Sequence, residues 1–513
     1  MRTPRVAVIG AGIAGLVATL ELAARGLDVV LLERATQPGG KMREVPVGSV
    51  RLDAGPTVLT LRDIFDQVFA TAGAALEDFV TLRPLTVLAR HAWDGGGQLD
   101  LFADRQRSAE AIGQFAGPGE GRRYLEFCAQ AQRIFDMLDG PFIRADRPSL
   151  FGLIGAFGPG RMGQLVHTQP FETLWGALGR HFHDPRLRQL FGRYATYVGS
   201  SPFQAPATLM LVAHVEQEGV WQVEGGMHRL AEAMASLAGR LGAEVRYGAE
   251  VAEVVVERGS VAAVRLASGE RIAADAVVVN GDAAAVAGGR FGPAIAGAVP
   301  RTEPGSRSLS AVTWLLHAEA EGFPLHHHNV FFSSQYRSEF DDVFKAGRLP
   351  RTPTVYVCAQ DRGDQDSGSP QGRERLFCLV NAPPSGDTRP LPGKEIELCA
   401  ERAFGLLARC GLSLHREAEL TRVVTPTDFE ALFPATGGAL YGKVSHGWKA
   451  SFDRPGVRTR IPGLYLAGGS VHPGPGVPMT ALSGRMAAAA VLADRASTGT
   501  SRRAATSGGT STR

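Results

Sequence analysis

The stretch Arg5-Val-Ala-Val-Ile-Gly10-Ala-Gly12-Ile-Ala-Gly15 places three glycines directly after a short apolar run. Arg5 to Ile9 predicts a buried parallel strand, and Ile13 to Arg25 predicts the helix that follows it. Val29 to Glu33 predicts a second strand. The three segments make a strand–helix–strand unit of about 30 residues, which is the length expected of a dinucleotide-binding unit.

The glycines lie where such a unit needs them. Gly10 permits the tight turn, Gly12 lets backbone N–H groups approach a pyrophosphate, and Gly15 lets the helix pack closely on the strand. The positive end of the helix dipole favours an anion at the same place. We assign Ala14, which lies inside this turn, to the cofactor site as well.

Glu33 ends the second predicted strand, 23 residues after Gly10. An acid about 20 residues after the turn grips ribose hydroxyls in dinucleotide sites, and its charge argues against a 2′-phosphate. A glycine-rich helix start without a ligand is disfavoured by this combination. The turn and the acid predict a dinucleotide but do not separate FAD from NAD.

Three further features favour FAD. Gly39-Gly40-Lys41 follows the acid after a short loop, and Arg51-Leu-Asp-Ala-Gly-Pro-Thr57 comes next. Near the C-terminus, Gly463 to Ser470 predicts a strand that ends in glycines and leads toward a helix, which is a second place for an anion.

The composition is that of an ordinary globular protein of two or three domains, with 513 residues, 44% apolar and 20% charged. The net charge of +3 does not indicate a nucleic-acid partner, but it allows weak attraction to an anionic membrane surface. The five cysteines are dispersed and form no CxxC pair, so we expect free thiols in a reducing cytoplasm.

The N-terminus resembles a secretory signal only superficially. Glycines and charges interrupt its apolar run, so we expect no signal peptide. No segment has about 18 uninterrupted apolar residues, so we expect no transmembrane helix. A location on the cytoplasmic side, peripherally associated with the membrane, is the expectation that remains.

The strand-forming segments lie far apart along the chain. We therefore expect a discontinuous Rossmann nucleotide domain from residues 1–75, 220–295 and 425–495. An inserted substrate-binding domain is expected from residues 76–219, mostly helical in pattern, and 296–424. Residues 496–513 contain Ser, Thr, Gly and Arg with little to bury, and are expected to be disordered.

These features together resemble the bacterial-type carotenoid desaturases, the phytoene desaturase relatives, from Pro4 to about Asp494. A glycine pair followed by His-Pro-Gly-x-Gly-x-Pro is the most specific of the matching motifs. Besides the first turn and Glu33, the matching segments are Gly39–Lys41, Asp53–Thr57, Gly225–Met227, Thr425–Phe429, Gly438–Gly442 and Gly468–Pro478.

The resemblance implies a mixed α/β, glutathione-reductase-like fold that binds FAD noncovalently. Gly10, Gly12 and Gly15 would hold the pyrophosphate, Glu33 the adenosine ribose, and Lys41 a phosphate or ribose. The remaining positions would surround adenine, the ribityl chain and the isoalloxazine: Thr57, Val58, Val251, Asn280, Leu440, Gly469, Val477, Pro478 and Met479.

Within this family the stretch Ser201 to Trp221 is most similar to the 1-hydroxycarotenoid 3,4-desaturases. The implied reaction passes a hydride from an acyclic carotenoid to flavin N5, with proton loss from the neighbouring carbon and oxygen or a quinone as the final acceptor. Phytoene desaturase, or another oxidase of the amine-oxidase type, is an alternative. A flavin-free lipid-binding escort protein of the same fold is a non-enzymatic alternative.

Two side chains are candidates for the proton step. Asp184 and Arg188 are spaced i,i+4 on a predicted helix and so share a face, although a solvated ion pair explains them as well. His326-His327-His328 suggests a metal site, but adjacent residues point in different directions on a regular element. No further ligand spacing supports one, so we expect no metal.

A carotenoid needs an apolar tunnel whose mouth faces lipid. Leu150–Phe157 and Pro206–Val215 are apolar enough to line it, although core packing explains them equally well. Phe142 to Met162 mixes apolar residues with arginines, as helical segments at a membrane interface do, and as ordinary surface helices also do.

Overall fold

The first strand, β1 (Arg5–Ile9), lies at the centre of a five-stranded parallel sheet. The computed structural model describes residues 4–146, 171–363, 370–450 and 452–506. The sheet gathers segments that are far apart in the sequence, as expected for this fold class. Its order is β20 (Leu464–Leu466), β13 (Ala276–Val279), β1, β2 (Asp28–Leu32) and β9 (Glu244–Arg246).

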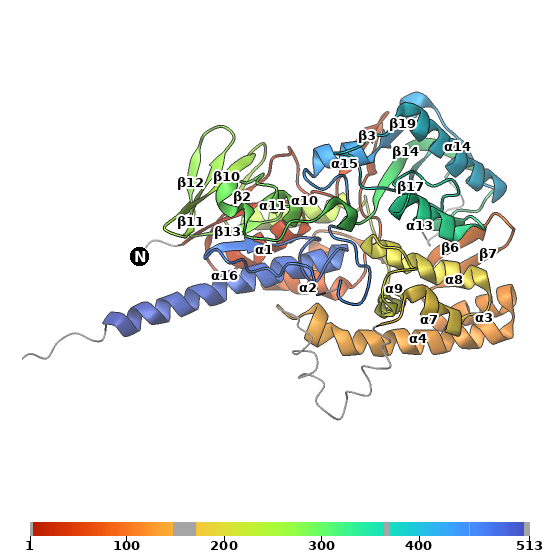
Figure 1. Ribbon diagram of the computed structural model, residues 1–513, viewed down its shortest axis with the longest axis horizontal. Helices are drawn as coiled ribbons and strands as arrows, with labels where there is room; N and C mark the ends of the chain where they lie inside the picture. The colour runs from red at the N-terminus through yellow and green to blue at the C-terminus, as the bar shows by residue number, and fades with distance from the viewer. Residues whose placement is uncertain (1–3, 147–170, 364–369, 451, 507–513) are drawn as a thin grey trace, which may run out of the picture.

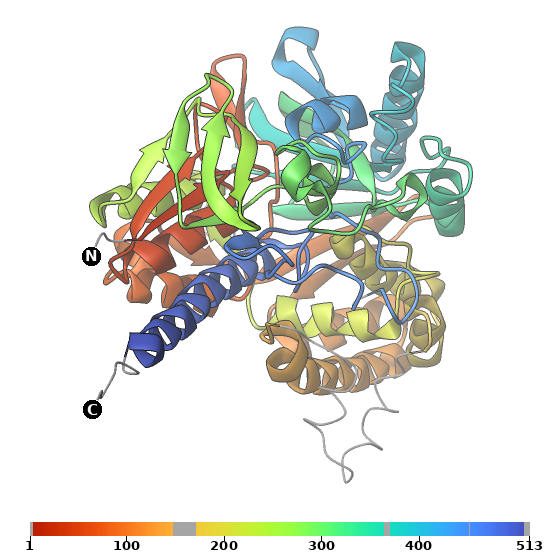
Figure 2. The same cartoon turned by 60° about the vertical axis from the view of Figure 1, so that its left-hand side comes forward.

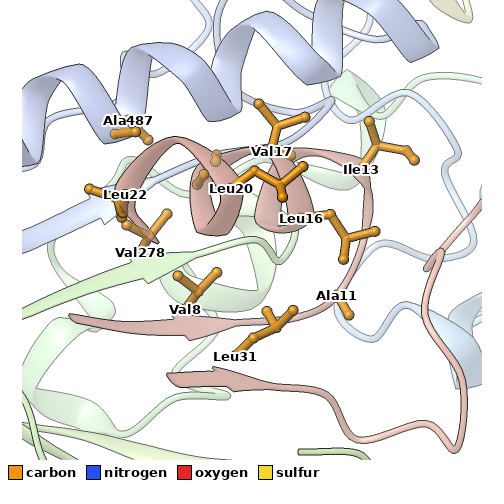
Figure 3. Packing of buried hydrophobic residues seen from close by; sticks show 14 of the residues in the cluster. Val8, Ala11, Ile13, Leu16, Val17, Leu20, Leu22, Leu31, Val278 and Ala487 are labelled. Atoms are coloured by element: carbon orange, nitrogen blue, oxygen red, sulfur yellow. The ribbon is translucent and has the colours of Figure 1, made fainter. Parts of the chain in front are cut away.

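Helix α1 (Ile13–Ala23) is buried along its whole length. Figure 3 shows Val8, Leu31 and Val278 pointing from the sheet toward α1, and Ala487 of α16 (Val477–Thr506) on the opposite side of it. A helix held between a sheet and a second helix has no solvent face, which explains why all of its residues except Thr19 and Glu21 are apolar or glycine. Helices α2 (Arg62–Thr71) and α10 (His228–Arg240) pack against the same core.

An antiparallel three-stranded sheet lies beside the parallel one (Figure 1). Its strands are β10 (Val251–Glu257), β11 (Ser260–Leu266) and β12 (Arg271–Ala273). Short helices follow at α11 (Ala283–Ala287) and α12 (Pro293–Ala296). Two ribbons pair β3 (Glu44–Val47) with β4 (Val50–Asp53), and β5 (Leu82–Pro84) with β8 (Trp221–Val223).

The other half of the molecule is built on an eight-stranded mixed sheet. Figure 1 shows this sheet to the right of the parallel sheet. Its strands are β6 (Val87–Trp93), β7 (Gln98–Phe102), β14 (Ser310–Glu321), β15 (His328–Phe332), β16 (Val355–Ala359), β17 (Glu374–Ala382), β18 (Ser413–His415) and β19 (Thr421–Val424). Helices α13 (Tyr336–Phe344), α14 (Gly393–Arg409) and α15 (Pro426–Leu432) accompany it.

A group of helices forms the lower part of this half (Figures 1 and 2). The longest, α4, has 21 residues and is followed by a π-helical turn at Asp139–Ile143. The group contains α3 (Arg105–Ala116), α4 (Pro118–Leu138), α7 (Leu174–His181), α8 (Pro185–Gly192) and α9 (Leu211–Gln217). None of the described helices is long and apolar enough to cross a bilayer.

The structure departs from the sequence-based expectation in two places. The region from residue 76 to 219 is not only helical, because β6 and β7 pair as an antiparallel hairpin at the edge of the large sheet. At the C-terminus, α16 continues to Thr506, past residue 496 where we expected a disordered tail. A lack of apolar residues argues against packing, but it does not prevent an existing helix from continuing. Residues 507–513 lie outside the described part.

Candidate flavin and substrate site

A single cavity of about 1320 Å³ joins the parallel sheet to the eight-stranded sheet. Ala14 and Gly15 of the first turn are not among its lining residues, because they lie in α1 behind the turn. The other predicted cofactor residues all line it: Gly10, Gly12, Glu33, Lys41, Thr57, Val58, Val251, Asn280, Leu440, Gly469, Val477, Pro478 and Met479.

The glycine turn has no room for side chains. Gly10 has φ +95°, and a Cβ at Gly15 would lie 2.0 Å from the Gly10 carbonyl oxygen. A Cβ at Gly12 would lie 2.7 Å from Oδ1 of Asn280. The turn therefore leaves bare backbone at the cavity wall, which is what a pyrophosphate requires.

Asn280 fixes this turn from a neighbouring strand. Its Oδ1 accepts a hydrogen bond of 2.9 Å from Gly15 N, and its Nδ2 donates to Ala467 O at 3.2 Å. One side chain thus ties the first turn to the end of β20. The glycine-rich segment that begins at Gly468 is thereby held beside the turn.

Glu33 lies at the cavity edge and is nearly buried. Its Oε2 accepts from Ala11 N at 2.7 Å and its Oε1 from Ala35 N at 2.8 Å. These bonds fix the carboxylate at the end of β2, next to the turn. This is the place of the ribose-binding acid in a dinucleotide site.

Lys41 reaches across the cavity wall. Its Nζ donates to Leu440 O at 2.7 Å and lies over the ring of Phe433. Burial lowers the pKa of Lys41, and the Asp282 carboxylate partly opposes that shift. The ammonium group therefore connects the loop after Glu33 to the segment before the C-terminal glycines.

Asp53 joins two of the motifs that carry the family resemblance. Its Oδ2 accepts from Met227 N at 2.6 Å and its Oδ1 from His228 N at 3.2 Å. A Cβ at Gly226 would lie 2.7 Å from Oδ2. The carboxylate therefore satisfies free N–H groups at the start of α10, and the glycine is required for its close approach.

Arg454 is a site residue that the sequence did not reveal. Its guanidinium lines the cavity and donates to Tyr441 O at 3.0 Å, Gly469 O at 3.2 Å and Lys443 O at 2.9 Å. Burial lowers the pKa of Arg454 to about 10, and the nearby Asp282 carboxylate partly opposes this shift. No local motif marks this arginine, because its partners are backbone carbonyls of separate loops.

The part of the cavity beyond the turn is mostly apolar. Its lining includes residues of α9, of the end of α4, of α13 and of one face of the large sheet. Apolar residues that line it include Phe135, Leu138, Phe142, Leu209, Leu211, Val212, Val215, Val330, Phe340, Phe377 and Leu379. Part of Pro206–Val215 is therefore in the lining, as expected, whereas Leu150–Phe157 lies outside the described residues.

Half-buried polar groups interrupt this apolar wall. The Tyr197 hydroxyl donates to Glu216 and accepts from Arg193 at 3.3 Å. The Tyr356 hydroxyl bonds to Thr57 Oγ1 and to His328 Nδ1, each at 2.7 Å. The first group belongs to the helical part of the lining and the second to the large sheet, and sequence patterns did not single out either as a site.

Asp184 and Arg188 lie outside the cavity lining. Asp184 caps α8 by accepting from Arg186 N at 2.8 Å, and it pairs with the Arg186 side chain rather than with Arg188. The Arg188 guanidinium lies 4.9 Å from the Trp175 ring centroid. The role of Asp184 and Arg188 in the proton step stays a prediction. In the structure Asp184 caps a helix and Arg188 stacks on an aromatic ring.

Two of the three adjacent histidines do come together, which differs from our expectation. Ligand atoms of His327, His328 and Cys358 lie within 4.8 Å of one another and are buried. The chain bends where β15 begins, so neighbouring rings meet. Each Nδ1 atom is already engaged, His327 with Arg362 O at 2.8 Å and His328 with the Tyr356 hydroxyl. The expectation that no metal is bound stays a prediction.

A family model and several known proteins are similar to this chain over most of its length. A family model described as flavin containing amine oxidoreductase matches residues 13–492. The hydroxyneurosporene desaturase of Rubrivivax gelatinosus is 56% identical over 514 residues, covering 100% of this chain and 98% of that protein. The protein of the same name from Cereibacter sphaeroides is 45% identical, with 96% and 98% covered.

A more distant relative is the 4,4'-diapolycopene oxygenase of a Methylomonas species, 31% identical, with 96% of this chain and 98% of that protein covered. Among solved structures, an oxidoreductase from Methanosarcina mazei has a TM-score of 0.60 at 16% identity, covering 94% of this chain and 99% of that one. Wild-type putrescine oxidase bound to putrescine has a TM-score of 0.60 at 16% identity, covering 96% and 99%. At such identities these structures establish the fold alone.

Proposed function

Because the chain belongs to the family of flavin-containing amine oxidoreductases, we propose that it is an FAD-dependent carotenoid desaturase. The reaction that we propose is introduction of the C-3,4 double bond into acyclic 1-hydroxycarotenoids. The relatives named hydroxyneurosporene desaturase, up to 56% identical over the whole chain, support this choice of substrate. Phytoene desaturation is the runner-up, and the escort-protein alternative is disfavoured by the intact turn.

One observation carries the proposal. All of the residues predicted to hold FAD except Ala14 and Gly15 line the same cavity of about 1320 Å³ as a mainly apolar wall. Ligand pockets are typically about 300–1,000 Å³, so this cavity has room for a dinucleotide and part of a second ligand. A long apolar chain would therefore meet the cofactor end of the cavity without leaving the protein.

Bound FAD would supply the hydride acceptor for the reaction. The protein's contribution is to hold one C–C bond in place and to exclude water. Side chains such as Val330, Leu379 and Leu440 give the wall that surrounds the reacting bond.

We propose that the cavity receives its substrate from a membrane surface. Phe171 lines the cavity, is 78% exposed, and packs edge-on against Trp448 at 5.4 Å between ring centroids. Phe142 and Phe452 lie in the same part of the lining and pack edge-on as well. The exposed Phe171 side chain at the cavity wall, with three half-buried aromatic rings beside it, suits contact with lipid.

Product analysis tests the proposed reaction. Purified protein reconstituted with FAD is incubated with a 1-hydroxylated acyclic carotenoid, or with phytoene, dispersed in lipid vesicles. We expect chromatography to show a product of the hydroxylated substrate with one additional conjugated double bond and little conversion of phytoene. Conversion of phytoene alone would contradict the proposed substrate and favour the runner-up.

A further inference from the structure

Helix α13 presents three side chains to the cavity at the end formed by the large sheet. Tyr336, Glu339 and Phe340 all line it. Their spacing of three and four residues places them on one face of the helix. Two of the three are polar, although the substrate compartment around them is mainly apolar.

The Tyr336 hydroxyl is buried and has no hydrogen-bond partner among the described residues. Its ring packs against other aromatic rings, 5.8 Å from Trp175 and 5.1 Å from Phe340 between centroids. The hydroxyl therefore cannot swing to another partner without repacking. An unpaired buried hydroxyl costs about 1–3 kcal/mol, so such groups are rare and call for a ligand.

Glu339 is held with its carboxyl group oriented. Asn381 Nδ2 donates to its Oε1 at 2.7 Å and Thr354 N donates to its Oε2 at 2.9 Å. Each carboxyl oxygen accepts more than one hydrogen bond, so acceptor positions remain. Burial raises the pKa of Glu339 to about 7, although the bonds from Thr354 and Asn381 act to lower it.

This polar pair is connected to the predicted flavin position through two strands of the large sheet. Asn381 is two residues beyond Leu379 on β17, a separation of about 7 Å on the same face of the sheet. Leu379 pairs with Tyr356 of β16, whose hydroxyl bonds to Thr57 at the predicted flavin position. In a 1-hydroxycarotenoid only one methylene separates the hydroxyl-bearing carbon from the C-3,4 bond. A hydroxyl subsite must therefore lie on the side of the cavity that adjoins the flavin, and the contacts from Asn381 through Leu379 and Tyr356 to Thr57 connect this pair to that side.

We propose that Tyr336 and Glu339 form the subsite that binds the tertiary hydroxyl group of the substrate. The Tyr336 hydroxyl donates to the substrate oxygen, and the substrate O–H donates to a Glu339 carboxyl oxygen. This inference rests on the proposed function. It also explains the choice of substrate. A hydrocarbon end group would leave the Tyr336 hydroxyl and the Glu339 carboxyl group without this partner in a dry cavity. A site built to bind a hydroxyl group therefore strongly rejects a substrate that lacks one.

The test compares two substrates in two matched variants. Tyr336→Phe removes only the hydroxyl oxygen from the cavity wall. Tyr124→Phe is the control, because the Tyr124 hydroxyl is also buried but accepts from Gln217 Nε2 away from the cavity lining. For each protein, kcat/KM is measured with a 1-hydroxylated acyclic carotenoid and with the same carotenoid lacking the hydroxyl group.

We expect Tyr336→Phe to lower the ratio of kcat/KM for the hydroxylated substrate to kcat/KM for the unhydroxylated one about tenfold, because the first loses a hydrogen bond and the second no longer leaves the Tyr336 hydroxyl unpaired. Tyr124→Phe should keep the wild-type ratio. An unchanged ratio in Tyr336→Phe would overturn the subsite while leaving the proposed function in place. A wild-type protein without preference for the hydroxylated substrate would instead remove the proposed function. If Tyr336→Phe does not fold, the same ratio is measured in Glu339→Leu. A lower ratio than in the wild type would support the subsite, and an unchanged ratio would overturn it.

Discussion

Replacing Gly15 by alanine is expected to abolish FAD binding. The new Cβ would lie 2.0 Å from the Gly10 carbonyl oxygen, and backbone at that distance must move. The movement separates α1 from β1 and distorts the turn that faces the pyrophosphate. Overpacking of this kind costs about 1–3 kcal/mol, occasionally more, and we expect the upper end because the shortest contact is with a backbone oxygen. The purified variant should be colourless.

The matched control is Gly239→Ala in α10, where nothing lies within 4 Å of the added Cβ. Alanine in a helix interior is favoured over glycine by about 1 kcal/mol, so this variant should keep its flavin and its stability. Gly12→Ala gives an intermediate case, because its Cβ meets only the Asn280 side chain at 2.7 Å. A yellow Gly15→Ala protein with wild-type FAD affinity would contradict the account of the turn.

The second large effect is expected at Arg362. Its Nε and Nη2 donate to the two carboxyl oxygens of Glu374 at 2.8 and 2.6 Å, and the two side chains are 8% and 1% exposed. Arg362→Met leaves the Glu374 carboxylate buried without its partner. Breaking a buried pair in this way costs about 3–5 kcal/mol. The pair lies at the ends of β16 and β17, which line the cavity, so activity should fall with stability.

Denaturant unfolding of Arg362→Met and of Arg373→Met checks this expectation. Arg373 pairs with Glu417 on the surface, where both side chains are largely exposed, so its removal should cost less than about 1 kcal/mol. The double variant Arg362→Met, Glu374→Leu should regain part of the loss, because no buried charge remains. Equal destabilisation by Arg362→Met and Arg373→Met would count against a structural role for the buried pair.

The cofactor half of the fold was predictable because its signals are local. The strand ending at Ile9, the glycines of the first turn and Glu33 lie within about 30 residues, the length of one unit. The packing partner of α1 was less predictable. The largely apolar sequence of α1 is consistent with burial, but only the structure identifies α16 as its second neighbour (Figure 3).

The hairpin of β6 and β7 shows a signal that was present but not used. Asp94-Gly-Gly-Gly97 stands between two runs that contain alternating apolar residues, which is a turn pattern between strands. We did not predict the hairpin, because the segments around it have a mostly helical pattern. The hairpin matters for the site, because β6 pairs with β15, and β15 carries Val330 into the cavity wall.

The polar groups of the substrate compartment were not predictable from spacing. Arg454 contacts carbonyls of separate loops, and Glu339 meets Asn381 across 42 residues of sequence. Such contacts leave no period or motif in the chain. They depend on how the large sheet is ordered, with β15, β16 and β17 side by side.

The most direct test of the central claim follows the flavin itself. The purified protein, loaded with FAD and free of oxygen, is mixed with a 1-hydroxylated acyclic carotenoid in lipid vesicles while the visible absorbance of the flavin is recorded. The account predicts bleaching of the oxidised flavin in step with the appearance of the carotenoid that has one more double bond. A yellow protein whose flavin stays oxidised in the presence of this substrate would contradict it.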